Sequence, residues 1–527
     1  MKIKASRGVE SHLAAGSSAP KAPRNLDPAM HQFERAREYT RALNATKLER
    51  MFAQPFLCQL GNGHVDGVYS FTKDPNDLTR FASGSGDGVV KCWNLSTREE
   101  VWKTTAAENI VKSMAFTKDQ KLLTASSDST IKLFDPYNTP SQTPPIQSWL
   151  GSHPYTSLSV HRDGRSFAAA TDCISVHSLD QYTAAPEVLR WPTAGSTINS
   201  VAFNQSETSV LASCSGDRSI ILYDLRTSSP LARTTLKFGL NKIVFNPMEP
   251  MNFVVASEDH NLYTFEYDIY FTFILLLQRM RSVQRSLNIY KGHVAAVMDV
   301  DWSPDGRGLV SGSYDRTIRL WNRDEGVSRD IYHTKRMQRI FSVAWSPDAN
   351  YVLSGSDDGN VRLWRANASK RQGIKSARHR QALEYNDALI ERYSHMPEIR
   401  RIRRHRHIPK VVKKAGEIKQ EELKAIKKRE ENERKHTKKQ FEKRQSERDK
   451  AILARGGTTN TRLVVRALVR RPLPQGAQRH PPPSLRGVDH PAMLSRRAPG
   501  NGYATHDRQH NVGHLRNIVV DGKRHEP

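Results

Sequence analysis

One pattern recurs along the first 365 residues of this 527-residue chain: an aspartate is followed six residues later by an aromatic residue. Six copies are clear, namely Asp87–Trp93, Asp128–Phe134, Asp217–Tyr223, Asp259–Phe265, Asp315–Trp321 and Asp358–Trp364. A weaker seventh copy has Asp172, with His177 near the aromatic position. Successive copies lie 41 to 45 residues apart, except for one interval of 56. A unit of this length cannot bury its apolar faces alone, so the seven units must stack against one another.

The sequence inside each unit is typical of short antiparallel strands. In the last copy the runs SVAWSP, VLSGS and NVRLW are separated by the turn pairs Pro347-Asp348 and Asp358-Gly359. A Gly-His pair precedes the best copies, at Gly63-His64 and Gly292-His293. This combination is the signature of WD40 repeats, in which four strands form each blade. We therefore predict an all-β, seven-bladed WD40 β-propeller over residues 52–369.

The ring of blades must also close. After Trp364 the chain becomes polar and offers no outer strand for the last blade. The segment Phe52–Leu60 precedes the first Gly-His pair and could supply that strand. We expect it to do so, because this removes an open sheet edge.

The repeats also contain the residue types of a hydrolase triad. They occur once as His293, Ser313 and Asp315, and again as His64, Ser85 and Asp87. A catalytic constellation occurs once, whereas a hydrogen-bond network that stabilises blades recurs, so the structural interpretation is favoured. Gly-rich phosphate loops, metal clusters and unique carboxylate pairs are missing from the sequence. We expect no enzyme, no catalytic residue, no cofactor and no metal site.

Other features point to a soluble intracellular protein. The four cysteines are not closely paired, which fits a reducing compartment: Cys58, Cys92, Cys173 and Cys214. The first 25 residues contain no apolar run of the kind that a secretory signal needs. The apolar run Ile269–Leu277 is too short to span a membrane.

The positive charge is concentrated in a C-terminal extension. Residues 400–450 contain 21 Lys and Arg against 9 Asp and Glu, whereas the first 399 residues contain 47 against 41. This asymmetry suggests a polyanionic partner, although a solvated tail or a nuclear-import signal is also compatible with it. We divide the chain into an N-terminal extension (1–51), the propeller and a basic helical domain (370–454).

Within the basic domain, residues 376–396 have apolar positions at roughly helical spacing, and Pro397 is expected to end or kink this helix. A dense basic cluster follows. Arginine suits bidentate contact with phosphate, so the cluster favours nucleic acid over a plain solvated face. The predicted RNA-binding residues are Arg400, Arg401, Arg403, Arg404, Arg406, Lys410, Lys413 and Lys414. Residues 421–450 are charged on nearly all faces. This predicts a solvent-exposed helix that bridges between two folded parts.

Two stretches do not follow the repeat pattern. The excess length of the 56-residue interval falls around residues 269–280, which form either a buried extra element or an error in the gene model. Residues 455–527 are rich in arginine and proline and are predicted to be disordered; translation from a wrong frame would also explain them.

Several stretches resemble a known family: HQFERAREYTRALNATKLERMFAQPF at 31–56, GHVAAVMDVDWSPDG at 292–306 and ALEYNDALIERYSHMPEIRRIRRHRHIPKVVKK at 382–414, together with 63–75 and 333–369. The family is the WD40-repeat protein of the small-subunit processome, which was first tied genetically to fibrillarin. The resemblance covers about residues 1–454, and the family's basic domain corresponds to residues 374–454.

The resemblance implies a non-catalytic scaffold in the nucleolus of the nucleus, needed for pre-rRNA processing and small ribosomal subunit biogenesis. Its partners would be pre-rRNA, a box C/D snoRNA ribonucleoprotein, fibrillarin and other processome proteins. The propeller would then contact proteins while the basic arm tracks the RNA backbone, mostly without base specificity.

A second function is implied by animal relatives, which resemble substrate receptors of a cullin-RING ubiquitin ligase. Such receptors bind the ligase adaptor through an aromatic-acidic-x-Arg ending on a WD repeat. Here only Tyr223, Asp224 and Arg226 fit this pattern. The alternative interpretation is an ordinary blade end with Arg226 in a surface ion pair.

Overall fold

The computed structural model describes residues 33–138, 144–180, 185–190, 196–226, 229–267, 286–370, 373–441, 444 and 446–457. All of them belong to a single compact unit. None of the helices in the described ranges is both long and apolar enough to cross a membrane.

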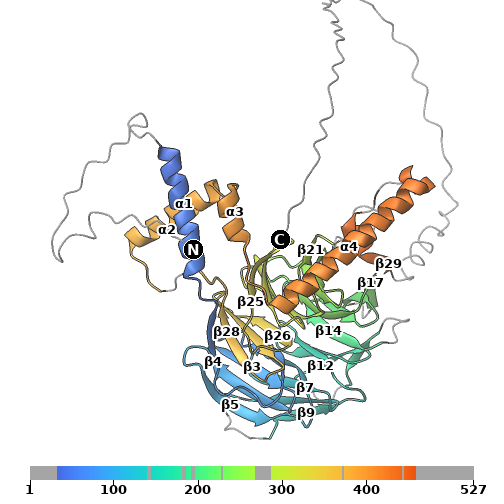
Figure 1. The fold of residues 1–527 in the computed structure, drawn as a ribbon. Helices are drawn as coiled ribbons and strands as arrows, with labels where there is room; N and C mark the ends of the chain where they lie inside the picture. Colours follow the sequence, from blue (N-terminus) through green and yellow to red (C-terminus); the bar gives the residue numbers. More distant parts are fainter. Residues whose placement is uncertain are drawn as a thin grey trace, which may run out of the picture. The chain divides into compact units, whose positions relative to one another are not determined.

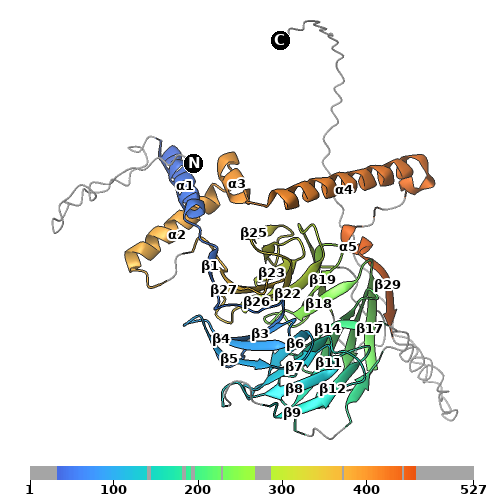
Figure 2. The same cartoon turned by 60° about the horizontal axis from the view of Figure 1, so that its bottom comes forward.

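The described strands form the predicted seven-bladed propeller (Figures 1 and 2), in which each blade is an antiparallel sheet of at least four strands. The first three blades consist of β2 (Val68–Lys73), β3 (Arg80–Ser85), β4 (Val89–Asn94) and β5 (Glu99–Thr105); β6 (Val111–Phe116), β7 (Leu122–Ser126), β8 (Thr130–Phe134) and β9 (Gln147–Leu150); and β10 (Ser157–Val160), β11 (Ser166–Ala170), β12 (Ile174–Ser178) and β13 (Glu187–Leu189). The third of these is the weak copy that the sequence marks with Asp172 and His177.

The next three blades continue the ring in chain order. They consist of β14 (Ile198–Phe203), β15 (Val210–Ser215), β16 (Ser219–Asp224) and β17 (Ser229–Leu236); β18 (Leu240–Phe245), β19 (Asn252–Ser257), β20 (Asn261–Glu266) and β21 (Asn288–Lys291); and β22 (Val297–Trp302), β23 (Gly308–Ser313), β24 (Ile318–Asn322) and β25 (Ser328–Tyr332). The seventh blade has β26 (Ile340–Trp345), β27 (Tyr351–Ser356), β28 (Val361–Arg365) and β1 (Phe56–Gln59).

The N-terminal side of the chain closes the ring, as predicted. Strand β1 is the outer strand of the seventh blade and pairs antiparallel with β28. The amide of Leu60 donates to the carbonyl of Val361 (2.9 Å), and the amide of Arg365 donates to the carbonyl of Pro55 (2.8 Å). The predicted strand segment began too early, because Phe52 instead follows the last helical turn of the N-terminal extension and is 62% exposed.

Hydrogen bonds between inner strands join each blade to the next. They use small polar side chains that reach a main-chain group of the neighbouring blade, and they link Ser70 to Val111, Ser113 to Leu158, Ser157 to Val201, Asn199 to Leu240, Asn241 to Val297, Asp299 to Val343 and Ser342 to Val68. Each bond satisfies a polar group that the packed ring removes from water. The ring is therefore continuous in hydrogen bonds as well as in apolar contact.

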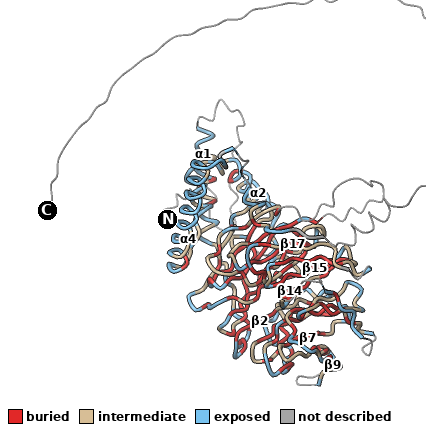
Figure 3. The backbone as a smooth tube through the Cα atoms, turned by 90° about the vertical axis from the view of Figure 1, so that its right-hand side faces the viewer, coloured by how far each residue is buried: buried red, intermediate tan, exposed pale blue. Residues whose placement is uncertain are grey.

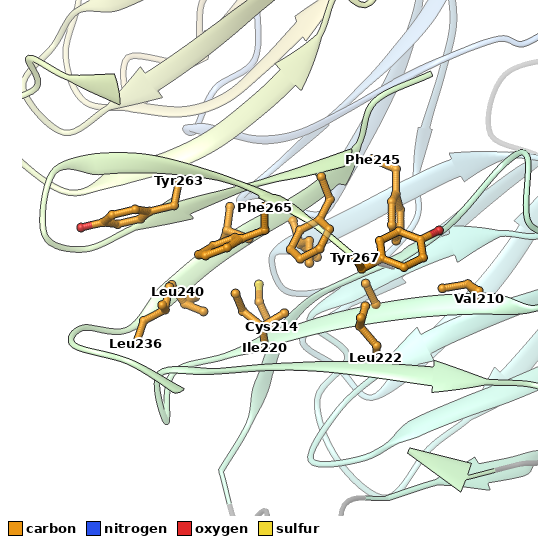
Figure 4. Close-up of a cluster of buried hydrophobic side chains, with 14 of the residues drawn as sticks. Val210, Cys214, Ile220, Leu222, Leu236, Leu240, Phe245, Tyr263, Phe265 and Tyr267 are labelled. Carbon is orange, nitrogen blue, oxygen red and sulfur yellow. The ribbon is translucent and has the colours of Figure 1, made fainter. Parts of the chain in front are cut away.

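The core lies between the faces of adjacent blades, where most buried residues gather (Figure 3). Seven clusters of buried apolar side chains fill these spaces, and Figure 4 shows the one between the fourth and fifth blades. Its labelled members are Val210, Cys214, Ile220, Leu222, Leu236, Leu240, Phe245, Tyr263, Phe265 and Tyr267. Burial between blades is what a single blade lacks, which explains why the repeats must form a ring.

His293 belongs to a buried network inside its blade. Its Nδ1 lies 2.9 Å from a carboxylate oxygen of Asp315, and its Nε2 lies 2.7 Å from the hydroxyl of Ser311. Because a carboxylate only accepts, Nδ1 carries the hydrogen, and Nε2 of the neutral ring accepts from Ser311. The indole N–H of Trp321 donates to the same hydroxyl (2.8 Å). Burial lowers the pKa of His293, which favours the neutral ring.

A similar network recurs in the first blade, where Ser83 lies 2.7 Å from Nε2 of His64 and accepts from Trp93. The structural interpretation of these residues is therefore confirmed, but the predicted serines were wrong. Ser313 donates to the main-chain carbonyls of Ala295 and Ala296, and Ser85 donates to that of Asp66. The histidines bond instead to the serine two residues earlier, which lies inside the strand. Ser313 and Ser85 are the last residues of β23 and β3, and they bond to the main chain that precedes the neighbouring strand.

The described residues outside the blades form mainly helices. They are α1 (Glu34–Met51), α2 (Ala377–Arg392), α3 (Pro397–Arg404), α4 (Lys410–His436), a 3₁₀ turn η3 (Lys438–Phe441) and α5 (Glu447–Lys450). The helix predicted at 376–396 is confirmed as α2, with Ser376 as its N-cap, and Pro397 starts α3 at the position where proline is tolerated.

The helical domain was predicted to extend to residue 454, but its last residues are not helical. Residues Ile452–Gly457 form a strand, β29, which adds to the outer strand β17 of the fourth blade. The strand crosses the predicted boundary between the basic domain and the tail. The predicted insertion at 269–280 and the tail from 458 onward lie outside the described residues.

We expect Ser311→Ala to destabilise the propeller by about 2–4 kcal/mol, because it leaves both His293 and Trp321 with a buried unpaired nitrogen. Ser354→Ala is the matched control, since Ser354 accepts from Trp364 (2.8 Å) and has no histidine bond. Its expected effect is about half as large. Thermal unfolding of the three proteins measures the difference; equal losses would contradict the shared-serine network.

Candidate nucleic-acid interface

Three helices form a small platform next to the propeller. One precedes the blades in the chain, and two follow them. Helix α1 packs against α2 and α3, and Ala42, Leu389 and Ile399 are buried together where they meet. The pairing of β1 with β28 explains this meeting, because the chain enters β1 and leaves β28 at the same corner. The amide of Gln54 still donates to the carbonyl of Ala368 (3.1 Å) beyond the strands.

Polar contacts fix α2 against α1. The guanidinium of Arg392 and the hydroxyl of Tyr393 both donate to the carboxylate of Glu38, at 3.1 and 2.8 Å. The rings of Tyr39 and Tyr393 contact edge to face, with centroids 6.1 Å apart. Of the apolar positions predicted for residues 376–396, Leu389 and Tyr393 therefore dock on α1, whereas Ala382 and Tyr385 are exposed.

Most of the predicted RNA-binding residues lie exposed on α3 and at the start of α4. On α3, the buried Ile399 faces the platform, while Arg400, Arg401 and Arg404 are placed by helical spacing on the opposite side. Arg403, Lys410, Lys413 and Lys414 are also exposed. Because Ile399 and Val412 are buried on the same two helices, the helices that carry the cationic side chains are anchored.

Arg406 lies differently from the other seven predicted residues. It follows α3, and only 17% of its side chain is exposed. Its Nε lies 3.8 Å from the carboxylate of Asp330 on β25, and Nη1 donates to the main-chain carbonyls of Arg403 and His405. Burial and the charge of the nearby Arg50 lower the pKa of Arg406.

Helix α4 contacts the propeller near its middle through Lys419. The ammonium donates to Nδ1 of His260 (2.9 Å) and to the carbonyl of His293 (3.2 Å). Burial lowers the pKa of Lys419, although the carboxylate of Asp259 acts in the opposite sense. Val412 is the one buried residue of α4. The exposed helix predicted over residues 421–450 is found only as far as His436, where α4 ends; η3 and α5 follow it. Nothing in the sequence marks Lys419 as a contact, because it is one of many lysines in a charged run.

The far end of the basic domain is attached to the fourth and fifth blades. Lys291 of β21 pairs with Glu447, and Lys450 pairs with Glu430 of α4 (2.7 Å). Ala451 and Ile452 pack into the core cluster of Figure 4. The basic domain is thus fixed to the propeller at both ends and in the middle.

The predicted adaptor-binding residues differ in how far they are exposed. Tyr223 is 1% exposed and belongs to the core, while Arg226 is exposed in the turn after β16. The guanidinium of Arg226 donates to the hydroxyl of Ser209 (3.0 Å), and its amide donates to Asp224 (3.0 Å). The β16–β17 turn lies at the opposite end of the blades from the β19–β20 turn that contacts Lys419. The two candidate surfaces therefore lie on opposite faces of the ring.

The described residues contain no group of three His, Cys, Asp or Glu side chains that could hold a metal ion. The four cysteines are free thiols, and Cys92 and Cys214 are buried. Burial raises the pKa of the Cys214 thiol to about 12, so it acts as an apolar core residue.

We expect Ile399→Ala to loosen α3 without affecting the propeller, because the cluster that Ile399 joins contains residues of the platform helices only. The loss of buried methyl groups should cost about 2–4 kcal/mol locally. Hydrogen exchange measures this as faster exchange of α3 amides at an unchanged propeller melting temperature. The half-buried Ile402→Ala is the control; equal exchange in both variants would show that α3 is held in another way.

Comparison with known proteins agrees with this architecture. Residues 366–452 match the Sof1-like domain, and residues 56–94, 99–135, 188–224, 284–322 and 331–365 match the WD domain, G-beta repeat. The former match covers the platform helix α2, the start of β29 and the segment between them. We call α3 and α4 in this segment the arm. The blades left unmatched include the third, which has the weak sequence copy.

Curated relatives match along most of their length. Protein SOF1 of Saccharomyces cerevisiae is 45% identical over 462 residues, which covers 82% of this chain and 91% of that protein. Protein sof1 of Schizosaccharomyces pombe is 48% identical over 430 residues (82% and 94%). DDB1- and CUL4-associated factor 13 of Danio rerio is 40% identical over 421 residues (79% and 90%). The chain therefore belongs to the Sof1-like family of WD40 proteins.

Proposed function

We propose that this protein is a non-catalytic scaffold for ribosome biogenesis, which acts in the nucleolar small-subunit processome during pre-rRNA processing. It binds RNA through α3 and the start of α4, and it binds proteins through the propeller. The RNA partners are pre-rRNA and the box C/D snoRNA ribonucleoprotein, and the protein partners include fibrillarin. Family membership supports the biological setting, and the fixed arginines of α3 support the RNA contact.

The observation that carries the proposal is the placement of the arginines on α3. A basic tail with no other role would carry its cations on a mobile part of the chain. Here Ile399 anchors the helix, and Arg400, Arg401 and Arg404 face the solvent. Guanidinium groups held in position lose less entropy when each binds a phosphate oxygen. Such contacts carry little sequence information, so the arm positions RNA rather than reading bases.

Helix α4 extends this cationic surface. At 27 residues it spans about 40 Å, and it is nearly all exposed. Lys410, Lys413 and Lys414 lie at its start, next to α3. The contact of Lys419 with the propeller fixes the direction in which this surface runs. RNA bound along it would lie on the same face of the ring as the β19–β20 turn.

We expect Arg400→Gln, Arg401→Gln and Arg404→Gln together to weaken binding to a short pre-rRNA transcript and to flatten its salt dependence. Each lost phosphate contact should lower the slope of log affinity against log salt by about 0.7 for single-stranded RNA. Fluorescence anisotropy over a salt series measures both effects. Arg165, Arg190 and Arg307 are exposed propeller arginines, and their triple glutamine variant is the control of equal charge. Equal slopes in the two triple variants would rule out α3 as the RNA contact.

A second candidate function is that of a substrate receptor in a cullin-RING ubiquitin ligase. Relatives from several animals and from Dictyostelium discoideum are named DDB1- and CUL4-associated factor 13. The exposed guanidinium of Arg226 favours this function, because an adaptor could contact it without disturbing the core. The burial of Tyr223 means that this residue supports the blade end and does not meet the adaptor directly.

We expect Arg226→Ala to abolish co-purification of the ligase adaptor, with little effect on stability, because Arg226 has only surface hydrogen bonds. Arg218→Ala, an exposed arginine at the other end of β16, is the control. Affinity purification followed by quantitative mass spectrometry gives the readout. If the adaptor does not co-purify with the unchanged protein, the receptor function is rejected.

A further inference from the structure

Three arginines from three parts of the chain meet at one carboxylate, where the platform joins the propeller. Arg50 of α1 and Arg329 of β25 lie 3.1 and 3.2 Å from the oxygens of Asp330, and Arg406 lies 3.8 Å away. Arg403 is close enough for its charge to act on Arg406. We call Arg50, Arg329, Arg403, Arg406 and Asp330 the junction; it holds four cations and one anion.

The arginines of the junction have donor capacity left over. A guanidinium has five N–H donors. Arg50 uses one nitrogen on Asp330 and one on the carbonyl of Arg403 (3.0 Å), and Arg329 uses one on Asp330 and one on the carbonyl of Ala366. The buried Nε of Arg406 makes no hydrogen bond to any described residue. A buried donor without a partner, beside an excess of positive charge, is the environment that an anion with several oxygens would complete.

The surroundings of the junction indicate which kind of anion would bind there. The exposed arginines of α3 end at Arg404, two residues before Arg406, so the junction continues their cationic surface toward the propeller. A polymer with a phosphate at each residue can occupy both at once. We infer that the junction binds a backbone phosphate of RNA, and that Asp330 is the internal counterion that keeps its arginines in place when RNA is absent.

This inference rests on the proposed RNA binding, and it differs from a purely structural role for the same residues. In a structural role Asp330 would hold the arm on the propeller, so removing its charge would loosen the arm and weaken RNA binding. In a phosphate site Asp330 competes with the phosphate for the same arginines, so removing its charge strengthens RNA binding. Ile399 in the platform cluster and the ring contact between His333 and His407 keep the arm attached without Asp330.

We expect Asp330→Asn to tighten binding of a fluorescent oligouridylate by roughly threefold or more at low salt, because asparagine keeps the shape and loses the competing charge. Asp324→Asn is the matched control. Asp324 also follows an arginine in the sixth blade and pairs with it (3.2 Å), but its side chain is 85% exposed. The control removes the same charge, so its affinity shows the effect of net charge alone. Affinity in Asp330→Asn equal to that of the control, or weaker, overturns the inference.

Arg329→Gln gives a second test that does not depend on the attachment of the arm. The bonds of Arg329 are to Asp330 and Ala366, both in or next to the propeller sheets, so its loss breaks no link to the arm. A phosphate site predicts weaker oligouridylate binding and a salt slope lower by about 0.7, whereas a structural role predicts no change. Arg323→Gln is the control in the same blade. Unchanged affinity in Arg329→Gln overturns the inference.

The two proposals fail in distinguishable ways. If the unchanged protein does not bind oligouridylate, RNA binding itself fails, and the junction inference fails with it. If the unchanged protein binds, the glutamine variants of α3 weaken binding and the junction variants do not alter it, only the junction inference fails. If a phosphoserine peptide binds in a way that depends on Arg329 while oligouridylate does not bind, the junction is a phosphopeptide site and the RNA inference is overturned.

Discussion

The antiparallel pairing of β1 with β28 is the contact on which the rest of the molecule depends. It completes the seventh blade with a strand from the other end of the repeat region, so β28 is not left as an unpaired edge. It also brings the residues before 56 and after 365 to the same corner. Helices α1, α2 and α3 can bury Ala42, Leu389 and Ile399 together only because of this meeting. Sheet closure and the presentation of the arginines are therefore two results of one pairing.

The features that repeat were predictable from the sequence, and those that occur once were mostly not. The seven copies of the aspartate pattern indicated the blades, and the polar chain after Trp364 indicated that the last strand must come from elsewhere. The serine of the blade network was misassigned, because Ser311 and Ser313 are the same residue type on the same face of β23, and they differ only in that Ser313 is the last residue of the strand. Which of the two reaches His293 depends on tertiary packing, which a local motif does not contain.

The candidate interface was predictable in composition but not in geometry. A dense run of arginines identified α3, yet the sequence could not distinguish the exposed Arg404 from the largely buried Arg406 two residues later. That difference comes from Asp330, which lies more than 70 residues away in the chain and has no mark in its own surroundings. Lys419 and β29 were missed for the same reason, since each acquires its role from a partner in a distant blade.

The closure of the ring also has a consequence for the order of events during synthesis. Residues 34–60 leave the ribosome first, but their partners at 361–404 leave it after almost the whole propeller has been made. Until then α1 has no apolar surface to cover, β1 has no β28 to pair with, and α3 has not been made. A nascent or truncated chain therefore exposes apolar surface and an unpaired sheet edge, and it has no ordered row of arginines. Under the proposed function, such a chain would lack the RNA-binding surface, because α3 and the platform that holds it form only after the propeller has been made.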